Sequence, residues 1–271
     1  MKHADLQKPE IRLSTIQQMA KGGRWRTEAM RSLSTGLFLW FTSGQGRITI
    51  AGVTRGYGPH SAIFIPAGTM HGFEVSPKVF GTAVFLPRSP DLPLPEEPLQ
   101  MRVLDVSAQA ELNACLQDLQ AEAESRRPLR ETALRYRAGL LSVWLHRQAR
   151  AERKTTIRPG KAAQLVMRYT DLIEHEFRTG KTVSDYAALL GVTPTHLSRV
   201  CNQACGRPAS ALLSDRVLYE ARRLLSETRD PIKDVARRLG FASAAYFTRA
   251  FQNHTGQTPS AFRRAARTLA G

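Results

Sequence analysis

The chain has 271 residues, of which 42% are hydrophobic and 23% charged, so we expect a folded protein of about two domains and not a disordered chain. Lys and Arg number 39 against 23 acidic residues, and this net charge of +16 favours a polyanion as partner. An apolar run near the roughly 20 residues that cross a bilayer, a signal-peptide core and a disulfide framework are all missing, so we expect a cytoplasmic protein with no membrane partner.

Short strands are predicted between residues 33 and 86. The runs 37–41 and 47–51 are rich in β-forming residues, and the connection 43–46 predicts a hairpin between them. Residues 62–65 stop at the turn Pro66-Ala67-Gly68, and 79–86 is a further apolar run. Many short strands separated by Gly and Pro indicate a small β-sandwich or barrel.

A proline-rich stretch and two helices follow. Five prolines between 87 and 98 exclude a helix or a central strand there and predict an extended connector. Apolar residues then recur at helical spacing within about 107–150, which predicts two helices. We expect these helices to pack mainly on the β domain, with a dimer contact as the smaller share.

The remainder of the chain is predicted to be helical. Residues 151–161 are polar, contain Pro159-Gly160 and read as an interdomain linker. Beyond Arg150 the sequence holds 20 basic and 10 acidic residues, and 16 of the bases are Arg. Because the planar guanidinium group suits phosphates and guanine edges, we expect this half of the chain to bind nucleic acid.

A weak internal repeat at an offset of 49 to 50 residues marks two helix-turn-helix units. Residues 183–192 align with 232–241, and both segments end in a Gly that suits a sharp turn. Thr182 with Asp185 predicts a capping box in the first unit, while Asp230-Pro231 predicts a cap followed by Pro at the first helical position in the second. A second helix follows each turn, and one long helix over 211–226 is expected to hold the units about 34 Å apart, in successive major grooves.

The outward faces of the two second helices are the predicted DNA-binding surface. Each presents a hydroxyl followed by an Arg, which suits contacts to base edges and phosphates. The candidates are Thr195, His196, Ser198, Arg199, Ala244, Thr248, Arg249 and Gln252.

The segments 221–225, 231–241, 246–251 and 256–263 resemble the signature of the AraC/XylS transcriptional regulators, over about residues 160–268. The resemblance implies a seven-helix DNA-binding domain, double-stranded promoter or operator DNA as partner, RNA polymerase as a second partner, and a homodimer formed through the helices near 107–150. Ala244 and Ala245 depart from the longer polar side chains that members often carry there. The second unit is therefore expected to read fewer bases.

The N-terminal half resembles a cupin-like sensor barrel. Gly58 and the run Pro66-Ala67-Gly68-Thr69-Met70-His71 are similar to the second cupin motif. A small apolar or aromatic effector is expected between the sheets, with Trp40, Phe64, His71 and Phe73 as candidate contacts. The first cupin motif is missing, because residues 33–58 contain no His and no acidic residue, so no metal site, cofactor or catalytic residue is expected.

The resulting prediction is a two-domain regulator of the AraC type, not an enzyme, controlled by a small molecule. Residues 1–150 form the cupin-like barrel with appended helices, 151–161 the linker, and 162–271 an all-α DNA-binding domain. Two alternatives stay open: a constitutive DNA-binding protein whose barrel only dimerises, and a cupin enzyme fused to a DNA-binding domain. The sequence leaves open the effector, the operator, whether transcription is activated or repressed, and whether the dimer forms through the helices 107–150 or the barrel.

Overall fold

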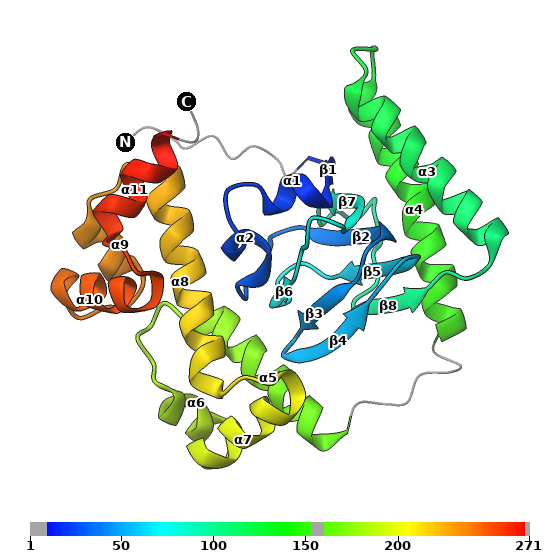
Figure 1. Ribbon diagram of the computed structural model, residues 1–271. Coiled ribbons are helices and arrows are strands. Elements are labelled where there is room, and N and C mark those ends of the chain that lie inside the picture. Colours follow the sequence, from blue (N-terminus) through cyan, green and yellow to red (C-terminus); the bar gives the residue numbers. More distant parts are fainter. Residues whose placement is uncertain (1–9, 153–159, 269–271) are drawn as a thin grey trace.

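The computed structural model describes residues 10–152 and 160–268 (Figure 1). The first part is built on two antiparallel sheets with added helices, and the last part is helical throughout its described residues. The predicted fold class, an all-β domain with appended helices followed by an all-α domain, is confirmed. In the described ranges, no helix has the length and apolar character that a membrane span requires.

In residues 10–152 and 160–268, eight strands form the two sheets. Sheet A has the order β1-β7-β2-β5-β8 and sheet B the order β4-β3-β6. The strands of sheet A are β1 (Arg12–Thr15), β2 (Gly36–Ser43), β5 (Ser61–Ile65), β7 (Phe80–Leu86) and β8 (Leu99–Arg102). Those of sheet B are β3 (Gly46–Ile50), β4 (Val53–Tyr57) and β6 (His71–Phe73).

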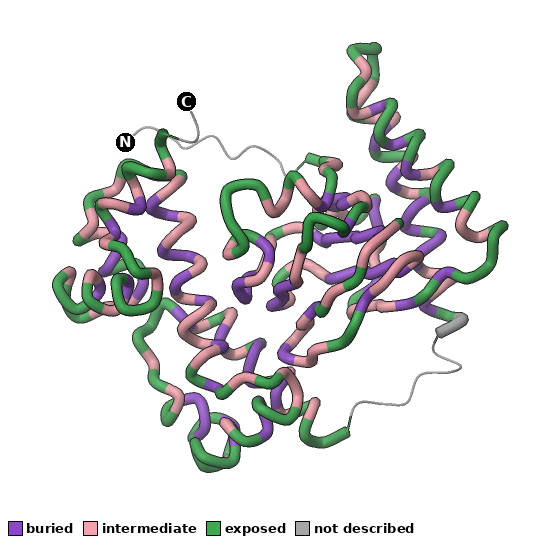
Figure 2. Tube along the Cα trace, viewed as in Figure 1, coloured by how far each residue is buried: buried purple, intermediate pink, exposed green. Residues whose placement is uncertain are grey.

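The two faces of sheet A bury two different cores, because successive side chains of a strand point to opposite sides. Leu37, Leu39 and Phe41 of β2 join an apolar core shared with sheet B. Phe38 and Trp40 join a second core with α3 (Val106–Glu124) and α4 (Arg130–Glu152). The two predicted helices thus cover the outer face of sheet A, and Figure 2 shows buried residues along the strands and the helix sides that face them.

Some short elements were not predicted from the sequence. They are the strands β1, β4, β6 and β8 and the helices α1 (Ile16–Ala20) and α2 (Trp25–Glu28). The predicted hairpin between 37–41 and 47–51 is wrong, because β2 belongs to sheet A and β3 to sheet B. The stretch 87–98 contains no helix and only an isolated bridge between Ser89 and Leu92, which closes a turn over residues 90–91.

Within residues 160–268, seven helices surround one apolar core. They are α5 (Lys161–Glu176), α6 (Val183–Leu189), α7 (Pro194–Cys205), α8 (Ala209–Glu227), α9 (Ile232–Arg238), α10 (Ala244–Thr255) and α11 (Pro259–Thr268). Helix α4 runs to Glu152 and α5 begins at Lys161, so helices occupy both ends of the predicted linker 151–161. Residues 153–159 of that linker lie outside the described residues.

The sheet part is docked on the helical part. Met30 and Met70, which are 1% and 2% exposed, belong to the same apolar core as α5–α11. The Trp25 ring centroid lies 5.8 Å from that of Tyr219 on α8 and 6.0 Å from that of Phe262 on α11. At the β3–β4 turn, a Cβ on Gly52 would lie 2.3 Å from Cγ1 of Val166, so backbone and α5 touch directly. The two parts therefore form a continuous packed unit.

Candidate DNA-binding site

The first helix-turn-helix unit consists of α6 and α7. The Thr182 side chain accepts from the Asp185 amide and the Asp185 carboxylate accepts from the Thr182 amide, so the predicted capping box is confirmed. Gly191, with φ +70°, makes the turn. Helix α7 starts with Thr193 as cap and Pro194 in its first turn. It buries Leu197, Val200 and Cys201, as predicted from their spacing.

The second unit repeats this arrangement with α9 and α10. Gly240, with φ +76°, makes the turn, and the Ser243 side chain caps α10 by accepting from the Tyr246 amide. Phe247 and Phe251 are buried as predicted, while Ala250 is half-buried. The predicted Asp230 cap is wrong by one residue: Pro231 is the N-cap of α9, because the Asp230 carboxylate instead accepts from Arg238 Nη1 at 2.7 Å.

The predicted DNA-contacting side chains lie on the outer faces of α7 and α10. Thr195, His196, Arg199, Arg249 and Gln252 are exposed, and Ser198, Ala244 and Thr248 are half-buried. Arg199 Nη2 lies 3.1 Å from Nδ1 of His196, whereas the Arg249 side chain contacts no other side chain among the described residues. Both guanidinium groups thus keep donors free for base edges or phosphates.

Tyr246 is a further surface residue that the prediction missed. It lies in the first turn of α10, is 57% exposed, and its ring is 5.8 Å from that of Phe241. The sequence did contain a signal for Tyr246, because it is an aromatic residue directly before the inward-facing Phe247. The prediction chose Thr248 and Arg249 instead, because a hydroxyl followed by an Arg suits contacts to DNA.

The two units are held together in two ways. Helix α8 runs between them, as predicted for residues 211–226, and buries Leu212, Leu218 and Leu225. The loop between α5 and α6 also touches the turn of the second unit: a Cβ on Gly240 would lie 2.5 Å from the carbonyl oxygen of Arg178, and one on Gly180 would lie 2.7 Å from that of Gly240. The backbone contact and the rigid helix together fix the relative orientation of α7 and α10.

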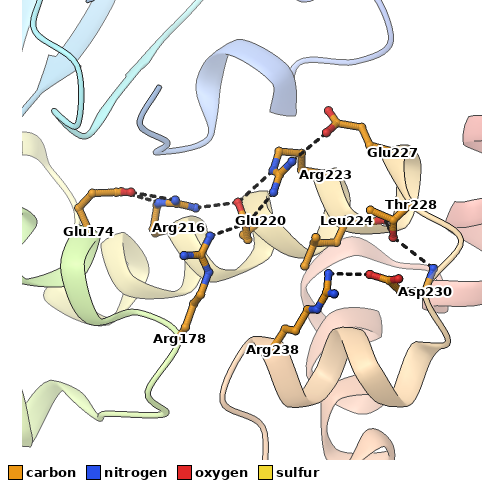
Figure 3. A network of polar contacts seen from close by, with 10 residues as sticks. All are labelled: Glu174, Arg178, Arg216, Glu220, Arg223, Leu224, Glu227, Thr228, Asp230 and Arg238. Atoms are coloured by element: carbon orange, nitrogen blue, oxygen red, sulfur yellow. Dashed lines mark hydrogen bonds and ion pairs between the residues drawn. The ribbon is translucent and has the colours of Figure 1, made fainter. Parts of the chain in front are cut away.

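A chain of charged groups crosses from α5 through α8 toward α9 (Figure 3). Arg216, whose side chain is 5% exposed, donates to both oxygens of Glu174 at 2.6 and 3.0 Å and lies 3.8 Å above the Phe177 ring. Glu220, equally buried, accepts from Arg178 at 2.8 Å and Arg223 at 2.9 Å. Each of these buried charges therefore lies beside an opposite charge. Removing one partner would leave the other charge buried and unpaired, which destabilises the fold.

The environment of Glu220 keeps it ionised. Burial raises the pKa of this carboxyl group, but the hydrogen bonds from Arg223 and Arg178 outweigh burial and lower the pKa to about 2. Glu220 is thus ionised at neutral pH, and its ion pairs with Arg178 and Arg216, together with the Arg216–Glu174 pair, connect α8 to α5 and to the residues that follow α5.

The four predicted effector contacts are not brought together in one site. Trp40 and Phe64 face α3 and α4, and Trp40 Nε1 donates to Asn113 Oδ1 at 2.9 Å. Phe73 instead packs between the two sheets, in a core filled by aliphatic and aromatic side chains. The reason is that Trp40 and Phe64 point to the outer face of sheet A, whereas Phe73 belongs to sheet B and points into the core between the sheets.

His71 lies apart from these three, at the contact with the helical part. It is 1% exposed, and its Nδ1 is 2.9 Å from the carbonyl oxygen of Thr69. Burial, together with the nearby Arg31 charge, lowers its pKa to about 3. Arg31, 2% exposed, lies above the rings of Phe73 and Tyr219 and donates to the Thr27 carbonyl. His71 is therefore neutral at physiological pH and serves the contact between the two parts.

Metal-binding and thiol chemistry find little support in the described residues. No group of three or more His, Cys, Asp or Glu gathers there in a way that could hold a metal ion. Burial raises the pKa of Cys201 to about 12 and also raises that of Cys205, whose thiol donates to the Cys201 carbonyl. Both thiols are thus protonated and unreactive.

Two matched helix-turn-helix units on one helical framework define the class of the C-terminal part as a tandem helix-turn-helix domain. The family model of a helix-turn-helix domain matches residues 186–265. The arabinose operon regulatory proteins of Salmonella typhimurium and Escherichia coli are both 36% identical over 81 residues, which is 30% of this chain and 29% and 28% of theirs. The chain thus covers less than a third of the length of these relatives.

Solved structures give similar matches. The C-terminal domain of AraT, a response regulator from Geobacillus stearothermophilus, is 31% identical and matches 39% of this chain and 88% of that domain, with a TM-score of 0.37. ToxT from Vibrio cholerae O395 matches 94% of this chain and 96% of its own, with 13% identity and a TM-score of 0.44.

Residues 186–265 thus form a helix-turn-helix domain similar to that of the arabinose operon regulatory proteins, and the predicted resemblance to the AraC/XylS family is confirmed over this part of the chain.

Proposed function

We propose that the protein is a sequence-specific DNA-binding transcription regulator that acts on double-stranded promoter DNA. One observation carries this proposal: α7 and α10 each expose an Arg beside a hydroxyl, and α8 and the Gly180–Gly240 contact hold the two helices in a fixed relation. Two helices in a fixed relation can enter successive major grooves of DNA. The protein then recognises two short base sequences at a set spacing.

The two helices contribute unequally to recognition in this proposal. On α7, Thr195, Ser198 and Arg199 offer hydrogen bonds to base edges, with His196 beside the Arg199 guanidinium. On α10, Arg249 and Gln252 do so, while Ala244 offers a methyl group that suits thymine. The first unit therefore carries more of the sequence preference than the second, which relies more on phosphates and DNA shape.

Homodimer formation through α4 is part of the same proposal. Tyr136, Leu140 and Val143 are 74%, 65% and 47% exposed and follow one another at helical spacing on the face of α4 away from sheet A. A row of exposed apolar side chains of this kind suits the same row of a second copy. A dimer would bring two DNA-binding domains to one promoter. RNA polymerase is the second proposed partner there, because a transcription regulator promotes or blocks its binding.

Control by a small molecule, in the cytoplasm, completes the proposal. The docked contacts of Met30, Met70 and Trp25 connect the sheet part to the DNA-binding helices, so a ligand that prefers one arrangement would change DNA binding. The proposed domains are 1–150 for sensing and dimerisation and 162–271 for DNA binding.

Selection of binding sites from a random pool of DNA duplexes, at about 150 mM salt, tests the proposal. We expect the full-length protein to enrich one motif with two conserved blocks. A bound pool without a shared motif would show that the positive charge alone binds DNA, and would contradict sequence-specific regulation.

A further inference from the structure

A pocket of about 570 Å³ opens between the proline-rich connector and the loop that follows β5. Phe64 and Leu92, which are 1% and 2% exposed, contribute its apolar floor, and prolines of the connector form much of its wall. Thr69, Arg88, Ser89 and Glu96 also line it. Its size is that of a small-molecule site, and it lies on the outer side of sheet A and not between the sheets.

Arg88 is the one cation that lines this pocket. Its guanidinium Nη2 donates to the Ala67 carbonyl oxygen at 2.7 Å, and among the described residues it has no carboxylate partner. The anchored guanidinium thus presents its other N–H groups to a ligand, a geometry that suits a carboxylate. Because the carboxylate of Glu96 lines the same pocket, a singly charged anion fits better than a phosphate.

The loop that forms one wall of the pocket also reaches the DNA-binding helices. Residues Pro66, Ala67 and Thr69 line the pocket, while Met70, the next residue, packs into the core of α5–α11. The loop is further tied by the Gly68 amide, which donates to the Leu33 carbonyl at 2.8 Å. A carboxylate that pairs with the other N–H groups of Arg88 would hold the guanidinium in place on the Ala67 carbonyl, and so strengthen a tether of the loop whose end lies in the DNA-binding domain.

We propose that this pocket binds a small molecule with an apolar body and one carboxylate, which pairs with Arg88. Residues 66–70 transmit its binding to the DNA-binding helices. This proposal rests on the proposed function, and it names the ligand class and the route of control.

Binding is tested first without DNA, on the full-length protein. Benzoate, phenylacetate and octanoate are each titrated up to about 1 mM beside their neutral amides, with the melting temperature as readout. We expect at least one acid to raise the Tm by about 3 °C and its amide to have no effect. Arg88→Gln should weaken that binding at least tenfold, and Ser89→Trp should block it by filling the pocket, whereas Arg102→Gln on the exposed edge of β8 should bind normally. No response to any acid, or equal responses of acid and amide, would overturn the proposal.

The route of control is tested by hydrogen exchange and DNA affinity. The bound acid should change amide exchange in 66–71 and also in α8, and should shift DNA affinity several-fold in the unmodified protein. Met70→Ala should keep acid binding but lose most of that shift. A change confined to the loop, or a full shift in Met70→Ala, would overturn the route. Because acid binding is measured without DNA, a failure of DNA recognition would not affect that measurement and would contradict only the proposed function.

Discussion

At the scale of single residues, the two candidate base-reading arginines have different surroundings. Arg199 shares its face of α7 with His196, whose Nδ1 lies 3.1 Å from its Nη2. That contact restrains the guanidinium before DNA arrives and reduces the side-chain entropy lost on binding. Arg249 on α10 has no comparable restraint among the described side chains, so it must be ordered by the DNA itself.

Replacing Arg199 by Ala should reduce affinity for the selected site about 10- to 100-fold, or about 1–3 kcal/mol, because a bidentate contact to guanine is lost. Arg249→Ala should cost less. Competition binding on specific and random duplexes measures both effects, with Arg102→Ala as the matched control on β8. An equal loss on random DNA would mean that these side chains contact phosphates only.

Glu220 predicts a specific loss of stability in acid. Its folded-state pKa of about 2 lies below the ordinary value of 4.5, so its stabilisation is complete at neutral pH and is lost as the pH falls from about 4.5 toward 2. We expect a loss of about 2 kcal/mol in the free energy of unfolding over this range from this group. Urea unfolding as a function of pH measures it, and Glu220→Gln should flatten the curve; an unchanged curve in the variant would refute the assignment.

At the scale of helices and strands, long periodic segments were predictable and short edge elements were not. The run of β-forming residues in 37–41 and the helical spacing of Leu112, Leu116 and Leu119 correctly predicted β2 and α3. The four-residue strands β1 and β8 carry no such signal, because so short a segment shows neither period, and their pairing with β7 and β5 is decided by tertiary contacts.

Two glycines between helices allow the cost of turn geometry to be measured separately from the cost of losing a close backbone contact. Gly240 and Gly256 both have a φ near +75°, but a Cβ would meet the Arg178 backbone at 2.5 Å in the first case and open space in the second. Gly256→Ala should therefore cost about 1 kcal/mol, the strain of a left-handed residue. Gly240→Ala should cost about 2–4 kcal/mol, since the two units must also move apart. Thermal unfolding and binding to the selected site measure both, and equal effects would show that the contact between the units is unimportant.

At the scale of the whole molecule, the contact between the two parts could not be read from the sequence. Trp25, Met30 and Met70 carry no shared period or motif, yet they meet α8, α11 and the core of the helical part. The sequence also did not predict that Trp40 and Phe73 belong to different cores. Trp40 packs on the outer face of sheet A, and Phe73 packs between the two sheets. The helix-turn-helix surface was predictable because capping residues, glycines and apolar spacing all agree locally.

A fragment of residues 160–271 should fold and still bind the selected site, because its seven helices share their own core. It should be less stable than the same region in the full chain, since the apolar groups of Trp25, Met30 and Met70 no longer cover it. Circular dichroism melting and binding to the selected duplex measure this. An unfolded fragment would contradict the proposed division near residues 151–161.

The central claim is that α7 and α10, held by α8 and the Gly180–Gly240 contact, read two sequence blocks at a fixed spacing. It is tested most directly by inserting about five base pairs, half a helical turn, between the two blocks of the selected site. The account predicts that affinity falls to the level that one unit alone provides, and that an insertion of a full turn does not restore it, because the units of one chain cannot separate by that distance. Unchanged affinity after the half-turn insertion would show that a single unit reads the site, and would contradict the claim.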